Sequence, residues 1–346
     1  MPKNKLSLQV NVEDFLPASD AEKESLTVMR QSVGFWKDGI RRLKRNKIAM
    51  VSIVVILLVF VFSFIVPQVY PYSYEQQIRG SENLAPMQYS EKELQAIEAG
   101  ESVFPHVLGT DNLGRDYAVR VMMGSRVSLI VGLVASAIIL IIGSIYGSVA
   151  GFFGGWLDMI MMRIVDMIYT VPDILIIVLL SVAFDQPLKA LAQKPGFEWI
   201  QVIGVNLISI FVVFALLYWV GMARIVRSQI LILKEQEYVT AARALGASSG
   251  HIIKKHLLTN CIGTLIVTTT LQIPSSIFTE SFLSFLGLGV AAPMPSLGSL
   301  ASAALNGLQS YPHRLFAPAL TISVIILSFN LLGDGLRDAF DPKLKD

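Results

Sequence analysis

Three acidic residues stand within or close to stretches of sequence that are otherwise apolar enough to cross a bilayer: Asp166, Asp173 and Glu280. A charge at the centre of a span costs about 2.5–3.5 kcal/mol on insertion scales, so such residues tend to face a bundle interior or a wet cavity. Arg163 precedes Asp166 by three residues and can pair with it on one helix face. Asp173 and Glu280 have no neighbouring cation in sequence. We therefore expect these two carboxylates to line a substrate path, and a proton relay is a further option.

The patterns that would indicate an enzyme are weak or missing. Residues 246–250 match the G-x-S-x-G nucleophile elbow, but a helix-patterned run precedes the serine where the elbow needs a strand. The sequence contains no G-x-x-x-x-G-K-[ST] phosphate loop and no H-E-x-x-H, and its single cysteine rules out a paired-cysteine metal site. The four histidines are scattered, and His106 and His313 are expected in surface loops. We expect no catalytic residue, no metal and no directly bound cofactor.

Composition indicates a membrane protein. The 346 residues are 53% hydrophobic and only 16% charged, whereas soluble domains carry about 25% charged residues. The net charge of +2 is too small to indicate nucleic acid as a partner.

The elements that must position these residues are membrane-spanning helices. A span needs about 20 predominantly apolar residues, and six stretches qualify, of which only the third carries several charges. The predicted fold class is therefore an all-α integral membrane protein with six transmembrane helices. The predicted spans are 48–66, 127–156, 157–184, 199–223, 257–288 and 315–333.

Lysines and arginines beside the spans predict the orientation, because they concentrate in cytoplasmic loops. They crowd the tail 1–47, the segment 224–256 and the tail 336–346, which six crossings place on one side. We expect all three to be cytoplasmic. The exception is the segment 67–126, which would be external although it holds Arg115, Arg120 and Arg126. Long loops obey the charge rule poorly, so the orientation stands.

The chain is predicted to divide into five parts. The tail 1–47 leads into the first transmembrane helix, 48–66. The sizeable external loop 67–126 reads as a small folded appendage. A core domain, 127–335, holds the other five helices, and the tail 336–346 follows. Prolines mark two further external loops, 185–198 and 289–314.

The second span has a glycine at every fourth position: Gly143, Gly147, Gly151 and Gly155. On a helix these glycines form one smooth strip that lets another helix approach closely. We expect helix packing there, although glycine is also simply common in membrane helices. The strip does not show whether the partner helix is internal or belongs to a second subunit.

Residues 237–260 are polar, helix-patterned and held between two spans. A first helix, about 234–245, is expected to stop at Gly246, and Ser248 or Ser249 can cap a second. Ala241 and Ala242 offer a small-residue surface made for close contact. From the residues alone, a docking element and an amphipathic loop resting on lipid headgroups are equally supported.

Four segments carry a resemblance to a known family. EYVTAARALGA…HLLTN resembles the cytoplasmic coupling motif of bacterial ABC importer permeases. LGTDNLGRDYAVRVMMGSRVSLIVG (108–132), GGWLDMIMMRIVDMIYTVPD (154–173) and FNLLGDGLRDAFDPKLKD (329–346) resemble the C-type permease subunit of its peptide/nickel branch. The resemblance runs from about residue 35 to the end. Thr259 departs from it, since the motif has proline there. Residues 185–198 and parts of 67–105 look like insertions.

The resemblance implies the type I ABC importer permease fold in a bacterial cell membrane. It implies a homologous second permease, two P-loop ATPases that bind ATP and Mg, and an extracytoplasmic substrate-binding protein as partners, with lipid around the spans. It also implies an ATPase-coupling set, in which small alanines allow close approach and Gly246 supplies the turn. That set comprises Glu237, Tyr238, Ala241, Ala242, Arg243, Gly246, Ala247 and His256.

The main hypothesis is thus a permease subunit of an ATP-driven importer for oligopeptides or dipeptides. Within the same class, a permease for nickel or a nickel chelate is the alternative. From another class, an ion-gradient-driven secondary transporter would use Asp173 and Glu280 as coupling carboxylates and would need no ATPase. A membrane enzyme is supported only by the serine pattern.

Overall fold

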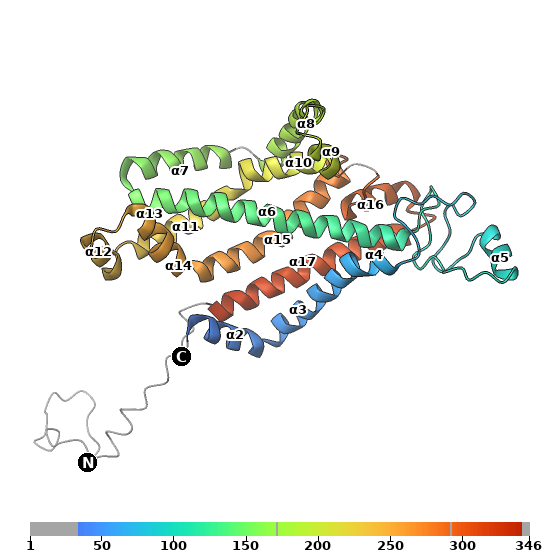
Figure 1. The fold of residues 1–346 in the computed structure, drawn as a ribbon, viewed down its shortest axis with the longest axis horizontal. Coiled ribbons are helices and arrows are strands. Elements are labelled where there is room, and N and C mark those ends of the chain that lie inside the picture. Colours follow the sequence, from blue (N-terminus) through green and yellow to red (C-terminus); the bar gives the residue numbers. More distant parts are fainter. Residues whose placement is uncertain (1–33, 171, 291–292, 341–346) are drawn as a thin grey trace, which may run out of the picture.

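The structure is a computed structural model that describes residues 34–170, 172–290 and 293–340 (Figure 1). Over these ranges the chain is almost entirely helical, with one isolated β-bridge between Thr110 and Asp116 and no strand. The outer parts of the two predicted tails, 1–33 and 341–346, lie outside the described residues.

Six helices are long and apolar enough to cross a membrane, which confirms the predicted all-α fold and the number of spans. Four of them are single α-helices, whereas a π-helical turn interrupts the first and the fourth. The six are α3–η2–α4 (Lys47–Val69), α6 (Tyr117–Phe153), α8 (Asp173–Ala192), α10–η3–α11 (Val205–Leu233), α15 (Ile262–Phe285) and α17 (His313–Phe340).

The third span differs from the prediction. α6 ends at Gly154, whose φ of +65° favours glycine, and the chain continues as a separate helix, α7 (Gly155–Tyr169). Pro172 then caps α8, which alone has the length and hydropathy of a span. The predicted stretch 157–184 therefore joins most of a helix that lies beside α6 to the first part of the actual span (Figure 1).

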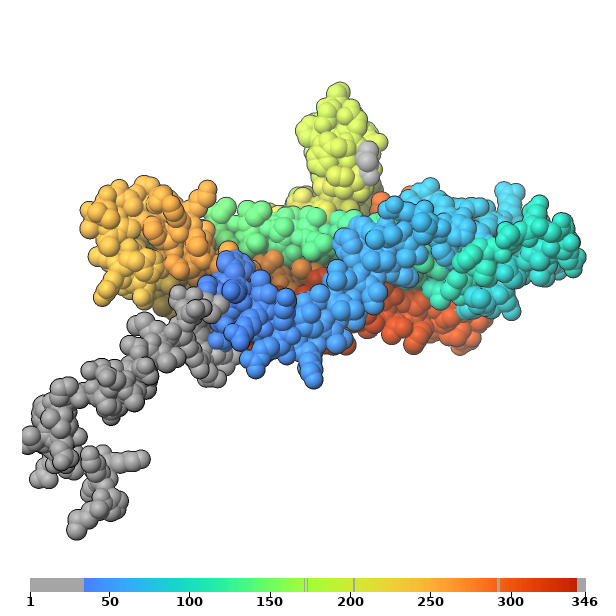
Figure 2. All heavy atoms as spheres, turned by 60° about the horizontal axis from the view of Figure 1, so that its bottom comes forward, coloured from blue at the N-terminus to red at the C-terminus, as the bar shows by residue number. Residues whose placement is uncertain are grey.

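Two predicted loop boundaries are also corrected. α6 begins at Tyr117 instead of 127, because the Asp116 carboxylate caps it by accepting a hydrogen bond from the Val119 N–H. Helix α8 runs to Ala192, through most of the predicted loop 185–198, with Pro187 inside it. The short helix α9 (Trp199–Ile203) follows, and α8 and α9 stand out from the bundle (Figure 2).

Three glycines of the predicted strip lie in the contact between α6 and α11 (Trp219–Leu233). A Cβ on Gly147 would lie 2.4 Å from the Ala223 carbonyl oxygen, and Gly143 and Gly151 are nearly as tight. The partner helix is thus internal. Gly155 differs from the expectation: no atom lies within 4 Å of its Cβ position, and its φ of +58° makes it part of the turn into α7.

The two ends of the bundle carry different elements (Figure 1). One end holds α12 (Glu237–Ala244) and the helical turns α13–η4–α14 (Ser249–Asn260). The amphipathic α2 (Phe35–Arg45) packs against α17, where an added Gly39 Cβ would touch the Phe340 ring. The opposite end holds the folded segment 70–116 with α5 (Glu91–Glu98), and α16 (Leu297–Ala304).

Segment 70–116 is held together by a buried histidine, which corrects the expectation of a surface position for His106. Its ring is fully buried and stacks on Tyr72 with centroids 4.5 Å apart. Its nitrogens lie 2.8 Å from Asp116 Oδ2 and 3.0 Å from Glu93 Oε1. Burial alone would lower the pKa of His106, but the two carboxylates outweigh it and raise the pKa above its ordinary 6.5. His106 thereby ties α5 to the start of α6.

Candidate functional site

Helix α12 ends in a turn that its sequence determines. Gly246 has a φ of +84°, and its N–H donates to the Arg243 carbonyl at 2.9 Å. The Ala247 N–H donates to the Ala242 carbonyl at 3.0 Å. This pair of hydrogen bonds is the Schellman motif, in which glycine is the usual residue with positive φ. The turn lies where the glycine predicts it and brings the second helix back toward the bundle.

The coupling segment, residues 237–260, is anchored on the bundle by its apolar face. Val239, Ile252 and Leu257 are fully buried in the cluster that also contains Phe152 of α6 and Ile230 of α11. Ala242 and Ala247 pack against the same cluster and are only partly exposed. The segment is therefore packed firmly onto α6 and α11.

Arg243 belongs to this anchored face. Its guanidinium lies over the Phe152 ring at 5.0 Å from the centroid, a cation–π contact. The predicted coupling residues thus divide into two groups. Ala242 and Ala247 pack on the bundle and Arg243, although exposed, contacts Phe152, whereas Ala241 and Gly246 are exposed without such a contact.

The outward face of α12 presents an apolar side chain that the sequence reasoning missed. Leu245 is 88% exposed, and Glu237, Tyr238 and Ala241 are exposed beside it. The sequence signal for it is a leucine directly before the glycine that ends the helix. A leucine this exposed has nothing to pack on within its own chain. The exposed face of the coupling segment is therefore partly apolar and fixed in shape.

The second helix of the segment begins and continues as its sequence allows. The Ser248 side chain caps it by accepting from the His251 N–H. Thr259, which replaces the family's proline, leaves the helix unbroken to Asn260. Asn260 donates to the Tyr238 hydroxyl at 3.2 Å and so links both helices. The partly exposed His256 ring lies 6.3 Å from that of Tyr238.

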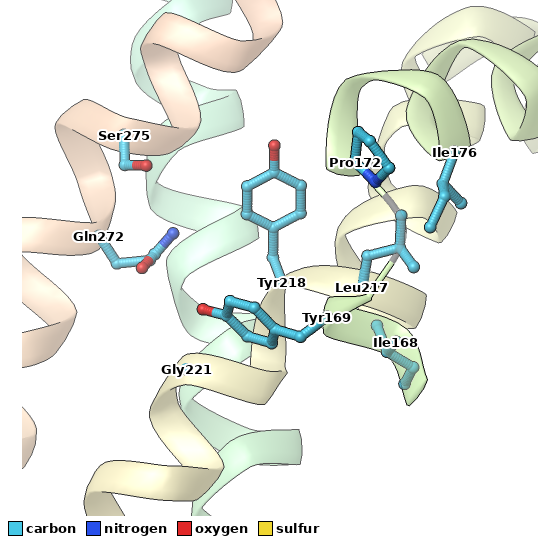
Figure 3. A pocket seen from close by; sticks show the side chains of 9 residues that line it. All are labelled: Ile168, Tyr169, Pro172, Ile176, Leu217, Tyr218, Gly221, Gln272 and Ser275. Carbon is cyan, nitrogen blue, oxygen red and sulfur yellow. The ribbon is translucent and has the colours of Figure 1, made fainter. Parts of the chain in front are cut away.

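A cavity of about 420 Å³ opens among α7, α8, α11 and α15 (Figure 3). One wall is apolar. The Tyr169 ring points across the cavity toward α15, which contributes Gln272 and Ser275. Tyr218 and Ser275 also line a second cavity of about 380 Å³, where the Tyr218 hydroxyl lies 3.2 Å from Thr279 Oγ1. The polar groups in both linings are uncharged hydroxyls and amides. The apolar wall consists of Ile168, Pro172, Ile176 and Leu217.

The charged residues of α7 pair with α11 at the edge of this region. Asp166 lies 2.8 Å from Arg224 Nη2 and does not use Arg163, the partner expected from the sequence. The Arg224 guanidinium also covers the Tyr169 ring at 4.2 Å. One turn farther along α11, Arg227 makes a bidentate pair with Asp158. These pairs hold α7 on α11.

Glu280 lies elsewhere than expected. Its side chain is fully buried between α15 and α6 and lines neither cavity. The Ser128 hydroxyl donates to Oε2 at 2.9 Å, and the Ser284 hydroxyl donates to Oε1 at 2.7 Å. Serine hydroxyls on both helices satisfy the carboxyl group, which explains its place inside the bundle. Asp173 opens α8 next to Pro172, a cavity-lining residue, and its side chain is outside the described atoms.

Comparison with known proteins identifies the architecture. The family described as "binding-protein-dependent transport system inner membrane component" matches residues 143–346. A second family, "N-terminal TM domain of oligopeptide transport permease C", matches residues 34–86. The chain belongs to the family of binding-protein-dependent transport system inner membrane components. It is thus a multi-pass membrane permease subunit of an importer and not itself a catalytic enzyme.

Several relatives align with this permease over nearly their whole length. The chain is 40% identical to the oligopeptide transport system permease protein OppC of Bacillus subtilis, over 95% of each chain. It is 41% identical to the dipeptide transport system permease protein DppC of the same organism, covering 97% of this chain and 95% of that one. It is 36% identical to OppC of Escherichia coli, covering 92% of this chain and 94% of that one.

Proposed function

We propose that this permease is one of two membrane subunits of an ATP-driven importer for oligopeptides or dipeptides. The substrate class rests on the names of its relatives. A homologous second permease would complete the translocation path, and an extracytoplasmic binding protein would deliver the peptide. Two P-loop ATPases would bind ATP and Mg. Both termini and the coupling segment would face the bacterial cytoplasm, where the ATPases are.

The observation that carries the coupling role is the rigid, outward-facing end of α12. Leu245 is 88% exposed on a helix whose opposite face is packed into the bundle. Interfaces derive most of their free energy from a few apolar anchors that fill a pocket on the partner. Leu245 has the shape and exposure of such an anchor, and we assign the opposing pocket to the ATPase.

The connections of the coupling segment account for the transmission of movement. Helix α11 ends at Leu233, close before α12, and α15 begins at Ile262, directly after α14. Tyr218, immediately before α11, and Gln272 of α15 both line the cavity. A displacement of the segment therefore reaches two walls of the cavity through packed helices. Closure of the ATPases would move these walls as rigid elements.

The cavity suits a peptide because its polar groups are neutral. Peptide N–H and C=O groups can hydrogen-bond to the Tyr218 and Ser275 hydroxyls and the Gln272 amide, while the apolar wall accepts side chains of varied size. No charged side chain is among the residues that line the two cavities in the described part of the chain. We propose these residues as the path, with Asp173 at its edge, in place of Glu280.

The experiment reconstitutes the permease with its second permease and ATPases in vesicles, adds the peptide-loaded binding protein, and measures peptide uptake with and without ATP. Leu245→Asp is expected to lower both peptide uptake and the amount of ATPase that co-purifies with the permease at least about thirtyfold. This factor corresponds to the loss of one interface hot spot of about 2 kcal/mol. Leu94→Asp is the matched control, since Leu94 is also exposed, at 48%, but lies on α5 at the other end of the bundle. Uptake without an ATPase, or normal coupling in Leu245→Asp, would contradict the proposal.

A further inference from the structure

A recess of about 340 Å³ lies at the end of the bundle that carries segment 70–116. It is framed by the loop 109–116, the start of α6, α16 and the start of α17. Three arginines line it: Arg115, Arg120 and Arg314. The rest of the lining is mixed, with polar residues (Asn83, Asn112, Asn306 and Tyr311) and apolar ones (Leu300, Ala303 and Ala304).

One carboxylate, that of Asp111, pairs with two of the three guanidinium groups. Asp111 Oδ2 lies 2.7 Å from Arg115 Nε and 3.5 Å from Arg120 Nε. Its other oxygen already accepts from the Leu113 and Arg115 N–H groups at 2.8 Å and 3.0 Å. Three positive charges and one negative charge leave the recess with a net charge of +2.

Arg120 and Arg314 are more than nine-tenths buried, at 8% and 7% exposure. Arg120 otherwise donates to the Tyr74 carbonyl, and Arg314 donates to the Thr110 carbonyl at 2.7 Å and to Asn83 Oδ1 at 3.0 Å. Within the described chain, the Nε of neither arginine has a hydrogen-bond partner. Burying a charge is costly unless it is paired. Asp111 pairs with Arg115 and Arg120, whereas Arg314 has no ion pair in the described chain, so the uncompensated positive charge of the recess favours an anion there.

We propose that this recess receives an acidic side chain of the peptide-delivering binding protein, so that it is a docking site for that partner. The inference rests on the proposed function, which places the binding protein at the end opposite the coupling segment. A carboxylate fits because guanidinium donors match its geometry in a bidentate way. We commit to a protein carboxylate because Asn83, Asn112 and Asn306 beside the arginines offer further hydrogen-bonding groups to a polar partner; the lining also contains Leu300, Ala303 and Ala304, so the test separates this occupant from an anionic lipid.

The test uses two nearly isosteric substitutions that put a carboxylate of the permease itself at the recess, Asn112→Asp and Asn306→Asp. Both asparagines are exposed, so the fold should tolerate the change. The matched control is Gln309→Glu, which adds the same charge to an exposed residue of the same loop outside the recess. The complete importer in neutral-lipid nanodiscs is titrated with its peptide-loaded binding protein, and ATPase stimulation is measured.

Each Asn→Asp variant is expected to raise the half-stimulating concentration of binding protein at least about tenfold, since its carboxylate competes for the arginines and repels the incoming acid. The control should change it less than about twofold, as for a screened surface charge. Basal ATPase rates should be equal in all variants. Rising salt should weaken stimulation of the unmodified importer more than that of the Asn→Asp variants.

Two results would overturn the docking site. One is that both Asn→Asp variants respond to the binding protein as Gln309→Glu does. The other is that anionic lipid in the nanodisc alone raises the half-stimulating concentration as Asn112→Asp does, since the recess would then take a lipid phosphate. If no binding protein stimulates the unmodified importer, the proposed function itself fails, which is a distinguishable outcome.

Discussion

Adding one methyl group to Gly147 tests whether α6 and α11 are held at glycine contact distance. An alanine Cβ there would meet the Ala223 carbonyl oxygen at 2.4 Å and the Val226 Cβ at 2.9 Å. Ordinary contact begins at 3.4 Å, so the helices must separate by about 1 Å. The obstructing atom belongs to the backbone and cannot rotate away. A gap of this size forfeits up to about half of each neighbouring van der Waals contact.

The free energy of unfolding should fall by about 2 kcal/mol in Gly147→Ala. Overpacking costs about 1–3 kcal/mol, and a backbone obstruction places this site at the upper end. The better helix propensity of alanine offsets about 1 kcal/mol. At Gly151 the nearest atoms are at 3.0 Å, so a shift of about 0.4 Å suffices and Gly151→Ala should cost less. Gly155→Ala meets no atom and should cost only the strain of its positive φ, about 1 kcal/mol.

The assay is thermal unfolding of the purified permease in mild detergent, followed by tryptophan fluorescence. A loss of 2 kcal/mol should lower the midpoint by about 3 °C for a chain of 346 residues. Gly250→Ala is the control, because Gly250 is exposed, has no atom within 4 Å of its Cβ position and lies at a helix start. If Gly147→Ala unfolds at the same temperature as Gly250→Ala, the close packing of α6 on α11 is refuted.

Three further outcomes are expected. His106, whose pKa is raised, stabilises segment 70–116 fully below pH 6.5, and this stabilisation is lost as the pH rises through the pKa of the folded state. Burial alone would raise the pKa of Glu93, but hydrogen bonds with the Ser90 N–H and His106 lower it below its ordinary 4.5, so Glu93 stabilises the segment above pH 4.5. Limited proteolysis of this segment should therefore be slowest between about pH 4.5 and 6.5, and His106→Gln should flatten this dependence. Asp158→Asn should destabilise the permease by about 1 kcal/mol, because the Arg227 pair is partly exposed, and a double-mutant cycle with Arg227→Gln measures it. Glu280→Gln should keep peptide uptake within about threefold of the unmodified importer, since the amide oxygen can accept from one serine hydroxyl and the amide NH2 can donate to the other; complete loss would instead favour ion coupling.

The spans could be predicted because their signal is local. A run of about 20 apolar residues is sufficient to cross a bilayer whatever surrounds it. The interruption between helices α7 and α8 near Pro172 could not be predicted in the same way. Glycine and proline are tolerated inside membrane helices when neighbours satisfy the backbone, so composition does not show which of them interrupts a helix. Here Gly154 and Pro172 interrupt one, and Pro187 does not.

The coupling segment shows where local chemistry stops being sufficient. The turn at Gly246 follows from its own residue type and was predicted at the right position. Which side chains face outward depends on a distant partner. Arg243 turns inward because Phe152 of α6 lies beneath it, and Leu245 is left exposed because no part of the described chain covers it. The motif as a whole can be predicted from the sequence. Which of its side chains face outward follows only from how the segment packs on α6 and α11.

The ionisable residues near the bilayer show most clearly that sequence neighbours are a poor guide to partners. Glu280 was read as isolated, yet Ser128, 152 residues away, donates to it. Arg115 and Arg120 were read as exceptions to the charge rule that a long loop can tolerate. In the structure they form, with Arg314, a recess whose positive charge exceeds that of its single carboxylate. A carboxyl group surrounded by serines is satisfied and has a structural role, whereas guanidinium groups with unused donors are not. This difference follows only from the three-dimensional structure. It makes the arginines of the recess better candidates for a functional role than Glu280.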